Sequence, residues 1–147
     1  MDSVAQMARP SSDVVLITEA EEVEAVNIDS ITYTNLATCF LKLGNSQKAL
    51  DNANEACSVK PIYWKAFLRK AEAQLLFGDV DRALSTLATA ESLLASEEGE
   101  AVATAATSPS SSRAAISEVR QRAARIEREA VRAQKEQWGG FLNKVNK

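Results

Sequence analysis

Three polar side chains have the types and the spacing needed to hold a carboxylate. Lys65 and Arg69 are four residues apart, so on a helix they share one face. Asn35 precedes Arg69 by 34 residues, which is the period of a repeat in this chain. Arg offers paired N–H donors, Lys offers a compact positive charge, and Asn offers both donors and an acceptor for peptide backbone. Together these side chains predict a peptide-binding site for an acidic segment.

Two helical hairpins would position these side chains, and the first covers residues 30–61. Gly44 is suited to end its first helix, Asn45 or Ser46 to cap its second, and Pro61 to end that second helix. Apolar residues at helical spacing predict the core faces. In the first helix they are Ile31, Leu36, Ala37, Phe40 and Leu43, and in the second Ala49, Leu50, Ala53, Ala56 and Val59.

A second copy of this pattern covers residues 62–95, with Asp79 suited to cap its second helix. The 34-residue period is typical of the tetratricopeptide helix–turn–helix repeat. Stacked copies would place Asn35 beside Arg69, with Lys65 one turn away, in a groove formed by the first helices. The shift pairs Tyr33 with Phe67, Ala37 with Ala71, Gly44 with Gly78, Ala49 with Ala83, Ala53 with Leu87 and Ala56 with Ala90.

The remaining segments differ in composition from the hairpins at 29–95. Residues 1–28 predict an acidic, largely disordered arm, although residues 13–25 could form a helix. The arm either covers the first hairpin or is the remnant of an upstream repeat. Residues 96–112, rich in Ala, Ser and Thr, predict a flexible loop. Residues 113–147 predict a long amphipathic capping helix, whose apolar stripe is Ile116, Val119, Ala123, Ile126, Ala130, Ala133 and Gln137. The predicted fold is all-α.

Composition argues against several classes of function. The 147 residues include no His and no metal-ligand spacing, so we expect neither a cofactor nor a metal. Without His, a glycine-rich phosphate loop or paired catalytic carboxylates, we do not expect an enzyme. The sequence has no concentrated basic face of the kind that predicts nucleic-acid binding. It also has no apolar run that approaches the ~20 residues needed to cross a bilayer. We expect a cytoplasmic protein in which Cys39 and Cys57 are reduced packing thiols rather than a disulfide.

The run NLATCFLKLG, followed by KAFLRKAEAQLL, resembles the tetratricopeptide domains of the large immunophilin co-chaperones. These are peptidyl-prolyl isomerases of the FK506-binding and cyclophilin-forty types. The resemblance implies that Asn35 matches an Asn of the family's second repeat, and that Lys65 and Arg69 match a Lys and an Arg of its third. In that family these residues form a carboxylate clamp for the C-terminal EEVD peptide of heat-shock chaperones. The C-terminal run EQWGGFLNK also resembles the family's basic-aromatic tail.

Two departures qualify what the resemblance implies. The family's first repeat adds a Lys and an Asn to the clamp, and no such repeat is recognised here, nor is an isomerase domain. We therefore expect weak, co-chaperone-like binding of acidic peptides by a partial clamp. The alternative is a structural subunit or assembly factor, in which a larger assembly or a second copy covers the first hairpin. The basic segment 120–147 is expected to serve as the capping helix, and its alternative is a calmodulin-like partner.

Overall fold

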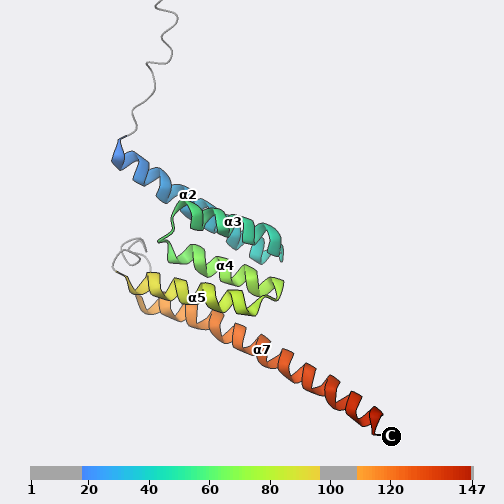
Figure 1. Cartoon of the computed structure of the whole chain (residues 1–147). Helices are drawn as coiled ribbons and strands as arrows, with labels where there is room; N and C mark the ends of the chain where they lie inside the picture. The colour runs from blue at the N-terminus through green and yellow to red at the C-terminus, as the bar shows by residue number, and fades with distance from the viewer. Residues whose placement is uncertain (1–17, 97–108, 147) are drawn as a thin grey trace, which may run out of the picture.

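The computed structural model describes residues 18–96 and 109–146, and these residues contain α-helices and no strand. Helices α2 and α3 form one hairpin, α4 and α5 form a second, and α7 follows them (Figure 1). This confirms the predicted all-α fold of tetratricopeptide-like hairpins with a long C-terminal helix. The bounds are Glu19–Lys42 for α2, Ser46–Val59 for α3, Trp64–Phe77 for α4, Val80–Ala95 for α5 and Pro109–Val145 for α7.

The helices stack in a repeating manner. Helix α4 contacts both helices of the first hairpin, and α7 contacts both helices of the second. The start of α7 therefore takes the place that the first helix of a further repeat would occupy. As a result, α2, α4 and the start of α7 contribute to one side of the stack.

Turn glycines and side-chain caps set the ends of the helices as predicted. Gly44 and Gly78 have φ of 72° and 87°, in the left-handed region that favours glycine after a helix. The Asn45 and Asp79 side chains each accept a hydrogen bond from the backbone N–H three residues later, at 3.1 and 3.3 Å. These helix ends could be predicted from the sequence because each one depends on a single residue type.

Alanines fill the contacts between helices, and one cluster of larger side chains joins α4, α5 and α7. Leu87 lies at its centre with no exposed surface, packed among residues such as Trp64, Leu68 and Ile116. Small side chains let the helices approach closely, which suits the high Ala content. The fully buried alanines are Ala37, Ala49, Ala53, Ala56, Ala66, Ala71, Ala73, Ala83, Ala90 and Ala123.

The buried face of α2 differs from the predicted one. Of its five predicted core residues only Ala37 is fully buried, whereas Leu36 and Leu43 are 41% and 76% exposed. The face that packs inward presents Ser30 and Thr34 instead. The Thr34 hydroxyl donates to the Ser30 carbonyl oxygen at 2.7 Å, so this polar group is satisfied within the helix. Hydropathy alone could not identify a face built from small polar side chains.

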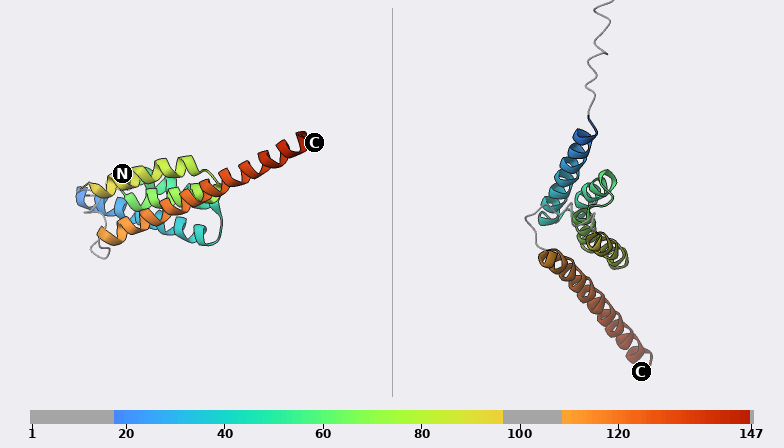
Figure 2. Two further views of the ribbon diagram at one scale, coloured as in Figure 1. Left: turned by 90° about the horizontal axis from the view of Figure 1, so that it is seen from below. Right: turned by 90° about the vertical axis from the view of Figure 1, so that its left-hand side faces the viewer.

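Helix α2 begins at Glu19, so residues 19–25 adopt the helical alternative and residues 26–28 are helical as well, rather than part of a disordered arm. Thr18 and Glu21 form a capping box, in which the Thr18 backbone N–H donates to Glu21 Oε2 at 2.8 Å. This hydrogen bond lowers the pKa of Glu21. The start of α2 extends past the end of the stack (Figures 1 and 2). The predictions for residues 1–17 lie outside the described residues.

Only the first half of α7 caps the stack. Ile116, Val119 and Ala123 are buried, and every described residue after Ile126 is exposed. The predicted apolar stripe is therefore wrong as a buried surface beyond that point. Length explains the difference, because the 37 residues of α7 span ~55 Å and the 16 residues of α5 only ~24 Å. The rest of α7 projects from the stack (Figures 1 and 2).

One expectation about these end segments is also modified. Helix α7 starts at Pro109, inside the predicted loop at 96–112. Residues 97–108 lie outside the described residues. None of the described helices combines the length and the apolar character that crossing a bilayer requires.

Candidate functional site

The predicted site residues line one cleft, with a volume of about 370 Å³, between α2, α4 and the start of α7. Asn35 lines it from α2, and Lys65 and Arg69 line it from α4. The 34-residue repeat explains this placement, because equivalent positions of stacked repeats are neighbours. Beside these three residues the lining comprises Ile31, Thr34, Thr38, Tyr63, Trp64, Leu68, Ser111, Ser112 and Ala115.

The cleft combines positive charge with an apolar wall. Asn35 is exposed, whereas Lys65 and Arg69 are half-buried, so their charges lie partly out of water. The Lys65 ammonium lies 5.7 Å from the centre of the Trp64 ring, at a distance that allows a cation–π contact. The apolar wall includes Ile31, which is 41% exposed. Such a cleft can take a carboxylate and an apolar side chain together.

Arg69 is held by an acidic neighbour that the sequence analysis missed. Its Nη1 lies 2.6 Å from Oε2 of Glu72, and the two side chains are only 32% and 15% exposed. The spacing of three residues on one helix was the signal that could have predicted the pair. A guanidinium has five N–H donors, so Arg69 retains donors for a second carboxylate. The contact with Glu72 also offsets part of the positive charge in the cleft.

Tyr63 lies at the start of α4 and contributes a hydroxyl near Arg69. Burial raises the pKa of Tyr63, while the positive charge of Arg69 acts in the opposite direction. The phenol is therefore neutral at pH 7 and keeps its O–H donor. Tyr63 lines the cleft, although no motif in the sequence indicated it.

The start of α7 supplies a third wall that the sequence analysis also missed. Ser111, Ser112 and Ala115 line the cleft, although the helix was predicted to begin only at residue 113. The N-terminal end of a helix carries partial positive charge. This wall therefore adds to the positive potential from Lys65 and Arg69. No local motif could have predicted it, because it depends on how α7 packs on the repeats.

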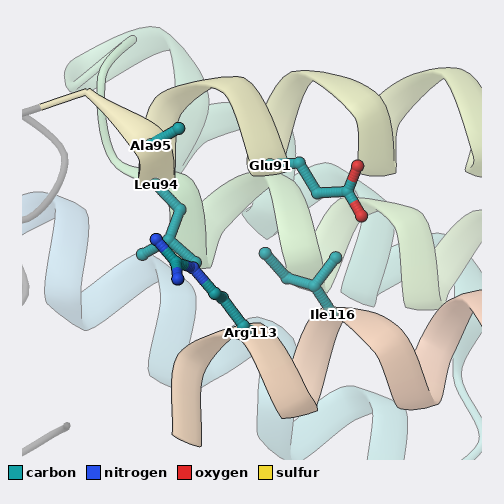
Figure 3. Close-up of a pocket in the computed structure, with 5 residues that line it drawn as sticks. All are labelled: Glu91, Leu94, Ala95, Arg113 and Ile116. Carbon is teal, nitrogen blue, oxygen red and sulfur yellow. The ribbon is translucent and has the colours of Figure 1, made fainter. Parts of the chain in front are cut away.

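A second cavity, of about 300 Å³, lies between the end of α5 and the start of α7 (Figure 3). It is lined by Glu91, Leu94, Ala95, Arg113 and Ile116. Leu94 and Ile116 are buried members of the main core cluster. Glu91 is already paired, because its Oε2 lies 2.7 Å from Arg120 Nη2. This cavity is a packing gap next to the core, with fewer polar groups than the cleft.

Within the described residues, no three His, Cys, Asp or Glu side chains are grouped as metal ligands would be.

The thiols of Cys39 and Cys57 are both free. Cys39 is exposed and Cys57 is half-buried, so the prediction that both pack between helices is wrong for Cys39. Burial raises the pKa of the Cys57 thiol to about 11, and the positive charge of Lys70 opposes this rise only in part. Only the thiolate is a strong nucleophile, so the buried thiol should react slowly near neutral pH.

The pKa of Cys57 gives a test of this burial. In a Cys39→Ser variant at pH 8, we expect iodoacetamide to modify Cys57 far more slowly in the folded chain than in urea. The rate should rise as the pH approaches 11, because the thiolate fraction grows towards that pKa. Mass spectrometry at timed intervals measures both rates. Equal rates in the folded and unfolded chains at pH 8 would show that Cys57 is not shielded.

Short segments of the chain are similar to known proteins. U-box domain-containing protein 70 of Oryza sativa subsp. japonica is 36% identical over 58 residues, which are 40% of this chain and 7% of that protein. The TPR repeat-containing thioredoxin TTL4 of Arabidopsis thaliana is 44% identical over 41 residues, 28% of this chain and 6% of that protein. Heat shock protein STI1 of Saccharomyces cerevisiae is 34% identical over 83 residues, 56% of this chain and 14% of that protein.

These similarities concern one domain, since the chain covers at most 14% of the length of those three relatives. No family model and no solved structure matches the chain. None of the three relatives is named as an immunophilin, so that closer resemblance stays a prediction. The stacked hairpins and the similarity to a repeat-containing relative together support a tetratricopeptide domain in this chain.

Proposed function

We propose that this chain is a protein-interaction module that binds acidic C-terminal peptides in the cleft between α2, α4 and α7. The observation that supports this most strongly is that Asn35, Lys65 and Arg69 line a single cleft. An Arg, a Lys and an Asn provide donors to carboxylates and both kinds of hydrogen-bonding group to peptide backbone. The proposal involves no catalytic step and no cofactor.

Each cleft residue has a distinct part in the proposed binding. Arg69 and Lys65 hold carboxylates of the peptide through charge-assisted hydrogen bonds, each worth about 1.5–3 kcal/mol. Asn35 bonds the peptide backbone, and the apolar wall that contains Ile31 contacts an apolar side chain. Binding is expected to be weak, because Arg69 is shared with Glu72.

The peptide that we propose first is the EEVD-type C-terminus of heat-shock chaperones. The carboxylates of this sequence suit Lys65 and Arg69, and its valine suits the apolar wall. The resemblance to immunophilin clamps and the similarity to a relative named as a heat shock protein support this choice. In this role the chain would act as a co-chaperone-like module in the cytoplasm.

A titration with a fluorescent peptide ending in EEVD tests the proposal. We expect saturable binding at low salt, with a dissociation constant on the order of 0.1 mM. The affinity should fall as salt is added, because charged groups supply much of the attraction. The matched control is the same peptide with a C-terminal amide, which lacks the terminal carboxylate and should bind more weakly. Absence of binding at millimolar peptide and low salt would refute the proposal.

A second candidate function is a structural subunit or assembly factor in a larger protein complex. The observation that favours it is the apolar surface left exposed on α2 and α7, including Leu43 at 76% and Trp138 at 59%. A partner could cover this surface without using the cleft. In that case substitution of Lys65 and Arg69 would leave the complex intact, whereas it would abolish peptide binding in the first candidate function.

A further inference from the structure

Two helix segments project from opposite ends of the molecule, and they carry opposite charge. Residues 18–29, which we call the acidic end of α2, contain five acidic side chains and no basic one. Residues 128–146, which we call the basic end of α7, contain four basic and two acidic side chains. In all three views the two segments lie far apart at opposite ends of the molecule (Figures 1 and 2). They cannot contact each other within one copy.

Both segments expose apolar side chains on a defined helical face. On the acidic end, Val23 and Val26 are 57% and 38% exposed, and they continue the spacing of the buried residues Ser30 and Ala37. The packing face of α2 therefore extends beyond the helices that cover it. On the basic end the exposed apolar residues are Val131, Trp138, Phe141, Leu142 and Val145, each between 54% and 63% exposed.

The exposed face of α7 is not a continuation of its packing face. The buried residues recur as Ile116, Val119 and Ala123, and this register continues through Ala130 and Ala133. Phe141 stays in this packing register. The other large apolar residues belong to another register, formed by Val131, Trp138, Leu142 and Val145 at spacings of seven, four and three, which turns them to an adjacent side of the helix. A further repeat stacked on this helix would therefore not cover them. This face needs a different partner.

Most charged side chains named below on these two segments form no ion pair within the described part of the chain. In the described part of the chain, Glu22, Glu24 and Asp29 form no ion pair, and neither do Arg128 and Lys135. The Trp138 and Phe141 rings pack edge to face, with centroids 6.0 Å apart, and Trp138 lies one helical turn after Lys135. Each segment thus offers an apolar stripe with free charges of one predominant sign.

We propose that the acidic end of α2 in one copy docks on the basic end of α7 in a second copy of this chain. Val23 and Val26 would pack on the stripe that contains Trp138 and Leu142, with carboxylates facing the basic groups. Such a contact is head-to-tail, so each copy has one acidic and one basic end to offer and assembly extends with concentration. The contact does not involve Asn35, Lys65 or Arg69, so it is independent of peptide binding.

Sedimentation velocity on the full chain at several concentrations tests this proposal. We expect species larger than one chain that increase with concentration and dissociate in high salt. Two variants each remove one end: Glu22→Lys/Glu24→Lys on α2 and Trp138→Ser/Leu142→Ser on α7. All four positions are exposed, so both variants should keep the circular dichroism of the wild type. Each variant alone should sediment as a monomer at concentrations where the wild type associates.

Mixing the two variants gives the sharpest result. Each variant keeps one intact end, so the mixture should form one-to-one pairs and no larger species. The matched control, Glu55→Lys/Asp81→Lys, reverses two exposed acidic residues on α3 and α5 and should associate as the wild type does. A wild-type chain that stays monomeric at every concentration in low salt would overturn the proposal. So would variants that associate like the wild type, or a mixture that stays monomeric.

Discussion

The double variant Lys65→Ala/Arg69→Ala is expected to lose measurable binding of an EEVD-ended peptide while its helical content stays unchanged. Each side chain supplies a charge-assisted hydrogen bond, so each loss should weaken binding about ten- to hundredfold. Wild-type binding is expected to be weak, and the combined loss would exceed the range of the titration. Both residues line the cleft and lie only half-buried, so their removal should leave the core intact.

The control for this variant removes two positive charges elsewhere. Lys42→Ala/Arg125→Ala has the same change in net charge, and both residues are exposed and lie outside the cleft. It should bind the peptide within about twofold of the wild type, because distant exposed charges are screened. If both double variants bind as the wild type does, the peptide does not occupy this cleft. If both lose binding equally, the attraction is a property of net charge alone.

Leu87→Ala is expected to cause a large loss of stability, about 2–5 kcal/mol in the free energy of unfolding. Leu87 has no exposed surface and lies in the cluster shared by α4, α5 and α7. Its truncation would leave a cavity where three helices meet, and the surrounding alanines are too small to fill it. Urea denaturation followed by circular dichroism measures the change.

Leu43→Ala is the matched control, since it removes the same atoms from a side chain that is 76% exposed. Its effect should stay within about 0.5 kcal/mol, as for most surface substitutions. Comparable losses in the two variants would mean that the cluster around Leu87 is not the main source of stability. A loss confined to Leu87→Ala would agree with a stack held together by the second hairpin and α7.

The sequence could predict the hairpins and their caps, because these depend on local chemistry. It could also predict that Asn35 and Arg69 lie near each other, because this depends on the repeat period. Gly44 and Asn45 act within one turn of the chain, so residue type was enough to identify them. The period of 34 residues then related Asn35 to Arg69, since stacked repeats bring equivalent positions together.

Other features depended on tertiary packing and could not be predicted in this way. Ser30 and Thr34 are buried because small side chains fit closely packed helices, which a hydropathy pattern does not record. Ser111 reaches the cleft only because α7 packs on α4 and α5. The end of the buried stripe after Ile126 follows from the length of the neighbouring helices.

Nuclear magnetic resonance of the isotope-labelled chain is the most direct test of the proposed peptide site. During titration with the EEVD-ended peptide, we expect the largest shifts in the side-chain N–H signals of Asn35 and Arg69 and in the backbone amides of Lys65 and Ser111. These groups surround one cleft, so they should titrate together with a single dissociation constant. Shifts confined to residues 128–146 of α7, or an unchanged spectrum at millimolar peptide, would contradict an acidic-peptide site between α2, α4 and α7.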